Sequence, residues 1–429
     1  MRHVEAYANR FGACPPQIAS KPEAALKIVV VIPCHNEPDL VSSLDALWQC
    51  DPPAWAVEVI VVVNAALGAS QSIQQQNEAS IRQARAWAAT HQRAGFAMHM
   101  LDRPGLLPKV AGVGLARKIG MDEALWRFAS AGQDDGVILC FDADCTCARN
   151  YLQAVMSHFQ EHPASPGCSI YFEHPLCGAL PPAVYEAVVL YELHLRYYVE
   201  ALRFAGFPFA FHTIGSSMAV RERVYREQGG MNKRKAGEDF YFLHKIIPLG
   251  EFGEVNSTTV HASPRPSDRV PFGTGRAVRQ YLADGTLPGY PLAAFRDLKE
   301  FFSRIPSLHL RENGTASLSE PLQSYCEQVG FSSALNAIRA NTASYGAFRN
   351  RFFRWFNGFH AMKYIHYARD HSYSEGNVIA EASHLLRELG GAALEFNAPQ
   401  NHESALLLLD VYRKRQRKGH QDSACNPTA

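Results

Sequence analysis

A short apolar run that ends in two carboxylates constrains the fold of this chain more than any other feature. Residues 137–141 read Val-Ile-Leu-Cys-Phe, and Asp142 and Asp144 follow. An uninterrupted apolar run of this length is typical of a parallel strand that is buried on both faces. Ligands of open α/β sheets bind beyond the carboxyl ends of the strands, so the two aspartates are predicted at a ligand-binding edge.

Further strands and helices alternate along the chain around this run. Residues 27–34 and 58–63, apolar apart from Lys27 and Glu58, indicate two more buried strands, which end in a polar loop and at Asn64. Apolar residues recur at helical spacing within 40–48, and a glycine-containing helix is predicted from 112 to 128. This alternation predicts an α/β fold with a doubly wound sheet and flanking helices.

The aspartate pair allows two interpretations. Two carboxylates this close repel each other unless a hard divalent cation such as Mg²⁺ or Mn²⁺ lies between them. They could instead cap a turn, because aspartate is a common turn residue. Cys145 and Cys147 suggest zinc, but no second cysteine or histidine pair stands at zinc-ribbon spacing.

Three downstream features carry candidate functional groups. Glu238 and Asp239 follow Gly237 directly before an apolar stripe at helical spacing, where carboxylates also serve as plain helix caps. His261 ends a predicted edge strand at 255–260, although a lone histidine is often structural. Arg269 and Arg276 flank a glycine-containing loop, and their guanidinium groups suit either a diphosphate or surface ion pairs.

Taken together and in this order, the motifs resemble those of the family 2 glycosyltransferases, which have the GT-A fold and use nucleotide-diphosphate sugars. The resemblance covers residues 26–265. The matching pieces are residues 32–37, Ala116-Arg117, the DXD motif Asp142-Ala143-Asp144, Gly229-Gly230-Met231 and Gly237-Glu238-Asp239. It implies a GT-A-type doubly wound mixed sheet and a hexosyltransferase-like activity.

The resemblance also implies roles for individual residues. Asp142, Asp144 and His261 would hold Mn²⁺ or Mg²⁺. Asp239 would be the catalytic base of an inverting transfer, and Glu238 would orient the site or the acceptor. The donor nucleotide would be bound by Pro33, His35, Glu37, Asn64, Lys109, Arg117, Asp142, Arg269 and Arg276, with Lys109 included on its charge alone.

One position departs from the family pattern. Relatives commonly have consecutive aspartates after the second strand, whereas this chain has Asn64-Ala65-Ala66. An asparagine both donates and accepts hydrogen bonds, and an ionised aspartate only accepts. The identity of the nucleotide base is therefore open. A retaining transferase without a base behind the sugar and a non-catalytic nucleotide-sugar binder are the alternatives, although carboxylates at both motifs favour an enzyme.

Composition agrees with a cytoplasmic enzyme. The 429 residues carry a net charge of +1, which excludes the global basic field of a nucleic-acid-binding protein. We find no apolar segment with the length of a signal peptide or a membrane span. Ten cysteines without framework spacing are expected to be reduced thiols.

The chain is expected to have four parts. These are an N-terminal extension (1–25), the glycosyltransferase domain (26–285), a mainly helical region (286–415) and a disordered tail (416–429). The helical region contains Phe348, Phe352, Phe356 and Phe359 on one helix face with basic residues nearby. This face is interpreted as packing on the catalytic domain, and the rival interpretation is a peripheral membrane or lipid-acceptor surface. The acceptor, whether a sugar, a lipid-linked sugar or a small molecule, is not assigned.

Overall fold

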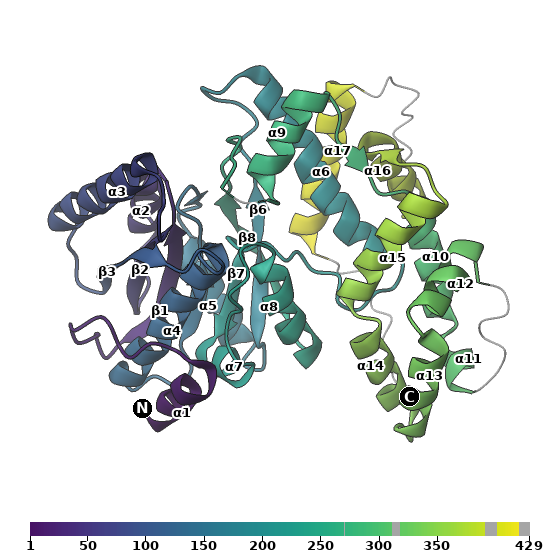
Figure 1. Cartoon of the computed structure of the whole chain (residues 1–429), viewed down its shortest axis with the longest axis horizontal. Coiled ribbons are helices and arrows are strands. Elements are labelled where there is room, and N and C mark those ends of the chain that lie inside the picture. The colour runs from purple at the N-terminus through teal and green to yellow at the C-terminus, as the bar shows by residue number, and fades with distance from the viewer. Residues whose placement is uncertain (270, 311–317, 391–400, 420–429) are drawn as a thin grey trace. The chain divides into compact units, whose positions relative to one another are not determined.

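The computed structural model describes residues 1–269, 271–310, 318–390 and 401–419, which form two compact units (Figure 1). The first unit comprises Met1–Ala179, Thr213–Arg276 and the chain from Arg417. The second comprises Leu180–His212 and Ala277–Gln416. The first unit contains the sheet and all the motifs described above, and the second is almost wholly helical.

An eight-stranded mixed sheet forms the centre of the first unit, in the order β3-β2-β1-β4-β7-β6-β8-β5. Strands β3, β2, β1 and β4 are parallel, and β7 runs antiparallel to both of its neighbours. The bounds are β1 (Leu26–Cys34), β2 (Ala56–Ala66), β3 (Phe96–Leu106), β4 (Val137–Cys140), β5 (Thr146–Cys147), β6 (Gly167–Glu173), β7 (Met218–Arg221) and β8 (Gly253–His261). The predicted α/β class with a doubly wound mixed sheet is confirmed.

Helices cover this sheet, and one of them approaches it very closely. They are α1 (Arg2–Phe11), α2 (Leu40–Trp48), α3 (Gln71–Thr90), α4 (Val113–Ala131), α5 (Tyr151–Glu161), α7 (Glu222–Glu227) and α8 (Glu238–Ile246), with a short 3₁₀ turn at Ile247–Leu249. Helix α4 is buried over most of its length. At Gly120 a Cβ atom would lie 2.4 Å from Cγ1 of Val31, so only glycine lets α4 lie this close to β1.

The position predicted for the strand before His261 is wrong in one respect. Strand β8 is not at the sheet edge, because it pairs with β6 on one side and with β5 on the other. Strand β5 has only two residues, Thr146 and Cys147, and so has no sequence pattern of its own. Its pairing with β8 places His261 opposite Thr146, two residues beyond Asp144.

The second unit is built from helices and one two-stranded ribbon. Its helices are α6 (Pro182–Phe204), α9 (Thr274–Asp284, which begins in the last residues of the first unit), α10 (Leu292–Ser303), α11 (Ile305–His309), α12 (Glu320–Gln328), α13 (Phe331–Ala340), α14 (Tyr345–Trp355), α15 (Gly358–His371), α16 (Val378–Glu388) and α17 (His402–Lys418). The ribbon joins β9 (Pro288–Gly289) to β10 (Gly376–Asn377). Helix α6 thus belongs to the helical unit although it lies within the segment expected to form the catalytic domain.

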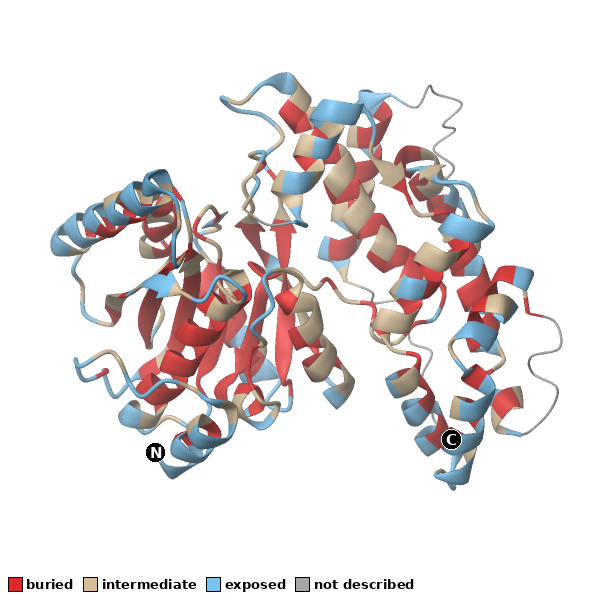
Figure 2. Cartoon of the chain, viewed as in Figure 1, coloured by how far each residue is buried: buried red, intermediate tan, exposed pale blue. Residues whose placement is uncertain are grey.

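Aromatic side chains form much of the core of the helical unit, whose buried residues are coloured red in Figure 2. The rings of Phe301 and Phe356 are 5.3 Å apart, and those of Phe302 and Phe353 are 5.2 Å apart. Phe348 and Phe352 of α14 and Phe356 just after it are fully buried, whereas Phe359 lies in α15, so the predicted aromatic stripe does not lie on one helix. None of the described helices combines the length and the apolarity that a bilayer crossing requires.

The basic run near the C-terminus is ordered where the structure describes it. Arg413 donates two hydrogen bonds of 2.7 Å to the buried carboxylate of Glu192, within the helical unit. Arg417, in the first unit, donates to Glu173 at 3.0 Å. Residues 416–418, which the sequence suggested as the start of a disordered tail, lie in the last turn of α17. Residues 420–429 lie outside the described part of the chain.

Candidate functional site

Several of the predicted functional side chains lie at or just beyond the carboxyl ends of parallel strands. Strands β1, β2 and β4 are parallel and in register, so the residues that follow them are neighbours. His35 and Glu37 follow β1, Asn64 lies near the end of β2, and Asp142 follows β4. The expected convergence of these segments at the carboxyl edge of the sheet is what the topology shows.

Arg117 connects the two acidic motifs. From helix α4 its guanidinium group donates to Asp142 Oδ1 at 2.6 Å, to Glu238 Oε1 at 3.0 Å and to the carbonyl oxygen of Gly215 at 2.5 Å. Arg117 is 2% exposed, and burial alone would lower its pKa. The negative charges of Asp142 and Glu238 outweigh this effect, so the pKa of Arg117 lies above its usual value. The structure gives Arg117 a buried position between the motifs, and its contact with the ribose or phosphates of the donor stays a prediction.

Asp239 lies beside this buried cation at the start of α8. Its Oδ1 accepts a hydrogen bond of 2.7 Å from the backbone N–H of Phe240. A Cβ atom at Gly215 would be 2.6 Å from Arg117 Nη2 and 3.1 Å from Asp239 Oδ2, so the glycine makes room for both groups. Burial and then the negative charge of Glu238 raise the pKa of Asp239 to about 7. A carboxylate with this pKa is suited to accept a proton near neutral pH.

Asp142, Asp144 and Cys145 form a group that could hold a metal ion. Their ligand atoms lie within 4.8 Å of one another, and no other group of three or more His, Cys, Asp or Glu residues does so in the described part of the chain. Burial and the two aspartates raise the pKa of the Cys145 thiol well above its usual range, so the thiol keeps its proton. The two carboxylates are hard oxygen ligands and therefore fit Mg²⁺ or Mn²⁺.

Each of these carboxylates has one oxygen that is available to a cation. Asp142 uses Oδ1 for Arg117, and Asp144 uses Oδ2 for Arg269. Their second oxygens have no hydrogen-bond partner among the described residues. Burial, followed by the charge of Asp142, raises the pKa of Asp144. His261 is not part of this group, and its role as a third ligand stays a prediction.

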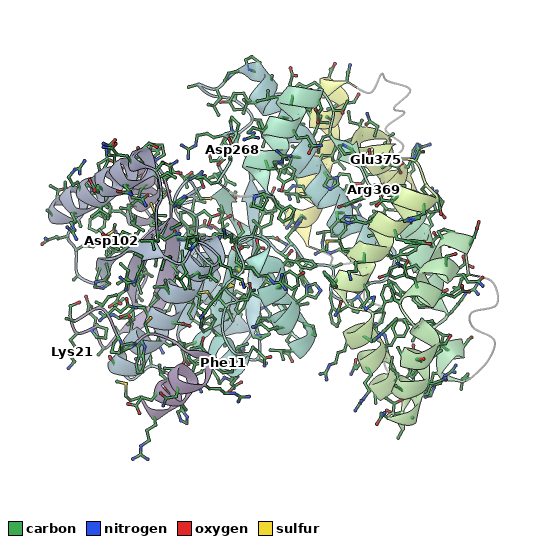
Figure 3. All side chains as sticks on the ribbon, viewed as in Figure 1. Phe11, Lys21, Asp102, Asp268, Arg369 and Glu375 are labelled. Carbon is green, nitrogen blue, oxygen red and sulfur yellow. The ribbon has the colours of Figure 1, made fainter. Side chains whose placement is uncertain are left out.

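Two arginines after β8 lie against Glu37 and Asp144. Arg265 Nη2 is 2.8 Å from each carboxylate oxygen of Glu37, and Arg269 Nη1 is 2.5 Å from Glu37 Oε2. Arg269 Nη2 donates to Asp144 Oδ2 at 2.8 Å. These arginines belong to the segment that Asp268 marks in Figure 3. Arg269 was predicted from the sequence, whereas Arg265 was missed, because nothing in its local pattern indicates a partner 228 residues away.

The loop after β1 is tied to the end of β2. His35 Nδ1 donates to the carbonyl oxygen of Asn64 at 2.7 Å, and Asn77 Nδ2 donates to the same oxygen at 3.1 Å. The side-chain oxygen of Asn77 accepts from the N–H of Asn36, whose φ of 50° is left-handed. These bonds fix the loop that contains Pro33 and His35. Asn77, from the middle of α3, was not predicted.

Two of the predicted donor-binding residues lie apart from these contacts. Lys109 is exposed in the turn before α4, and Arg276 is exposed in the first turn of α9. Neither forms an ion pair with a described residue. Both were proposed on charge alone or from a glycine-containing loop, and their roles stay predictions.

Comparison with a family model identifies the catalytic class. Residues 109–266 match the model of glycosyl transferase family 21. This segment contains Arg117, Asp142, Asp144, Glu238 and Asp239, which are the residues that the structure brings together. The protein is a glycosyltransferase. The narrower resemblance to family 2 stays a prediction, and no curated protein matches the chain.

Solved structures of TarS from S. aureus show only weak similarity. TarS 1–349 in complex with UDP-GlcNAc is 15% identical, with 85% of this chain and 93% of that chain covered and a TM-score of 0.38. TarS 1–349 alone is 14% identical, with 92% of each chain covered and a TM-score of 0.35. Similarity at this level does not establish a shared fold or a shared ligand.

Proposed function

We propose that the glycosyltransferase is an inverting, metal-dependent enzyme of the GT-A fold that uses a nucleotide-diphosphate sugar. The observation that carries the proposal is the position of Arg117, which binds Asp142 of one motif and Glu238 of the other. We thereby assign the donor to the motif of Asp142 and the acceptor to the motif of Glu238, which Arg117 holds close together. The order of strands β3-β2-β1-β4 and the order of the motifs support a family 2 type of site.

The donor side of the site is assigned to the β1, β2 and β4 ends. Asp142 and Asp144 would hold Mg²⁺ or Mn²⁺ together with phosphate oxygens of the donor. A cation held there offsets the negative charge that develops on the departing diphosphate. We assign the base and ribose to Asn64 and to the loop fixed by His35. The side chain of Asn64 can both donate hydrogen bonds to a base edge and accept them from it.

The acceptor side of the site is assigned to the first turn of α8. Asp239 takes the proton of the acceptor hydroxyl as its oxygen bonds to the anomeric carbon and the bond to the diphosphate breaks. The raised pKa of Asp239 supports this role, because a base is most effective when its pKa lies near the working pH. Glu238, held by Arg117, fixes the backbone from which Asp239 projects.

The proposal is tested by substitution of Asp239 with asparagine. Asp239→Asn keeps the shape of the side chain but cannot take the proton, so turnover should fall by roughly 10²–10⁴. The donor should still bind. The matched control is Asp134→Asn. Asp134 is exposed in the loop before the first residue of β4, whereas Asp142 follows the last.

Two measurements complete this test. A thermal-shift screen of nucleotide sugars with and without Mn²⁺ identifies the donor, because a ligand that binds only the folded protein raises its apparent stability. The anomeric configuration of the product then distinguishes inversion from retention. Normal turnover of Asp239→Asn with a retained anomer would support a retaining enzyme, and nucleotide binding without any transfer would support a non-catalytic binder.

A further inference from the structure

Four charged side chains form a closed group at the donor side of the site. Glu37 is fully buried, yet its carboxylate accepts from both Arg265 and Arg269. Asp144 is bound by Arg269 at 2.8 Å and lies 3.6 Å from Arg265. Two carboxylates are therefore matched by two guanidinium groups, so the group is neutral without any bound ion.

The members of this group differ in their access to solvent. The side chain of Glu37 has no exposed surface, whereas those of Arg265 and Arg269 are 31% and 27% exposed and that of Asp144 is 23% exposed. The bonds between the arginines and Glu37 thus lie on the inner side of the group. The contact between Arg269 and Asp144 lies nearer to solvent, where a ligand can replace it at lower cost.

Arg269 binds the carboxylate that the proposed function assigns to a divalent cation. The charge-assisted hydrogen bond from Arg269 Nη2 uses Asp144 Oδ2, one of the two oxygens that the carboxylate can offer. A guanidinium group at this distance opposes a second cation at the same carboxylate. Binding of a divalent cation and pairing with Arg269 should therefore compete.

We propose that Arg269 is an internal counterion that exchanges places with the divalent cation at Asp144. In the cation-free protein Arg269, assisted by Arg265, neutralises Asp144. When the cation and the donor bind, Arg269 leaves Asp144, keeps its bond to the buried Glu37 and turns its second nitrogen toward the donor diphosphate. A planar guanidinium group with several N–H donors can bind Glu37 and a phosphate oxygen at the same time.

This inference rests on the proposed function and predicts opposite changes in two affinities. Without Arg269 the cation has no competitor, so Arg269→Gln should bind Mn²⁺ more tightly in the absence of nucleotide, by roughly tenfold for one lost charge-assisted hydrogen bond. With saturating Mn²⁺ the same variant should bind a nucleoside diphosphate more weakly, because the phosphates lose a cationic partner. A purely structural arginine would not produce changes of opposite sign.

The experiment is calorimetric titration of Mn²⁺, and then of UDP and GDP at saturating Mn²⁺, into the full chain and its variants. The control is Arg223→Gln, which removes one exposed arginine from α7. Strand β7 ends at Arg221 opposite Val137, the first residue of β4, so Arg223 lies toward the sheet edge away from Asp144. The control should bind Mn²⁺ and nucleotide as the parent does.

Arg265→Gln provides a second variant in case loss of Arg269 unfolds the protein. Its guanidinium group is farther from Asp144, so the gain in Mn²⁺ affinity should be smaller and in the same direction. If Arg269→Gln folds and binds Mn²⁺ no more tightly than the parent, the proposed exchange alone is overturned. If Arg269→Gln does not fold, the same result in Arg265→Gln overturns it. A parent chain that binds neither Mn²⁺ nor nucleotide would overturn the proposed function together with it.

Discussion

Removal of the buried guanidinium group of Arg117, which lies between the two acidic motifs, should destabilise the protein strongly. Arg117→Met keeps an unbranched side chain of similar length but leaves two carboxylates and the Gly215 carbonyl without their donor. Breaking a buried ion pair by removing one partner costs about 3–5 kcal/mol. The side chain of Asp142 is 34% exposed and can be hydrated, whereas that of Glu238 is only 4% exposed.

Most of the cost therefore comes from Glu238, and we expect a loss of about 3 kcal/mol, at the lower end of that range. For a unit of this size the loss corresponds to a fall in Tm of about 6–12 °C. Thermal unfolding followed by intrinsic fluorescence at neutral pH measures the change. The exposed Arg223→Met is the control and should unfold within about 1–2 °C of the parent.

A second substitution separates the ion pair from simple packing. Glu238→Gln removes the charge that Arg117→Met leaves buried, so the double variant should be more stable than Arg117→Met alone. A fall in Tm no larger than that of the control would refute the reasoning. A double variant no more stable than Arg117→Met would show that lost packing, and not the uncompensated carboxylate, causes the effect.

Other expected outcomes concern the same site. Because the pKa of Asp239 is raised to about 7, it is ionised only above that pH, so kcat/KM should rise with pH and level off near pH 8, and Asp239→Asn should lose this dependence. The raised pKa also means that protonated Asp239 stabilises the fold at low pH and that this contribution is lost as pH rises from about 4 to 7. The free energy of urea unfolding should therefore differ less between these two pH values in Asp239→Asn than in the parent. Asp144→Ala should abolish the effect of Mn²⁺ on nucleotide affinity, and equal calorimetric affinities with Mn²⁺ and with chelator in the parent would refute the metal assignment. His261→Ala should weaken Mn²⁺ binding and leave the melting temperature of the metal-free protein unchanged if His261 is a ligand, whereas the reverse pattern would make it structural. Gly215→Ala should lower turnover, because its Cβ would lie 2.6 Å from Arg117 Nη2; unchanged kinetics would show that the site tolerates the shift.

Periodicity in the sequence was sufficient to predict several strands of the sheet but not all of them. Residues 28–34, 59–63 and 137–140 are continuously apolar, and the structure places them in β1, β2 and β4. Strand β3 was not predicted, because its sequence turns polar at Asp102, and most of its residues are only half-buried. Strand β5 depends on pairing with β8 and so leaves no local pattern.

The candidate site shows the same division between local and long-range information. Asp142 and Asp239 were predicted because each stands in a short motif at the end or start of a regular element. The carboxylate partners of Arg117 were not predicted, since they lie 25 and 121 residues further along the chain. Arg265 was missed for the same reason. Residue type indicates which group can ionise, but the counterions of a buried charge are fixed by tertiary structure.

The membership of α6 in the helical unit has a practical consequence for shortened forms of the protein. Within that unit α6 packs against α10 and α16, and its Leu193 and Tyr197 are fully buried. A fragment cloned to residue 285, as the sequence motifs suggest, would contain α6 but lack both partner helices. The apolar face of α6 would then be exposed to water, and such faces promote aggregation. Expression trials that stop there should give insoluble material even though every residue of the motifs is present.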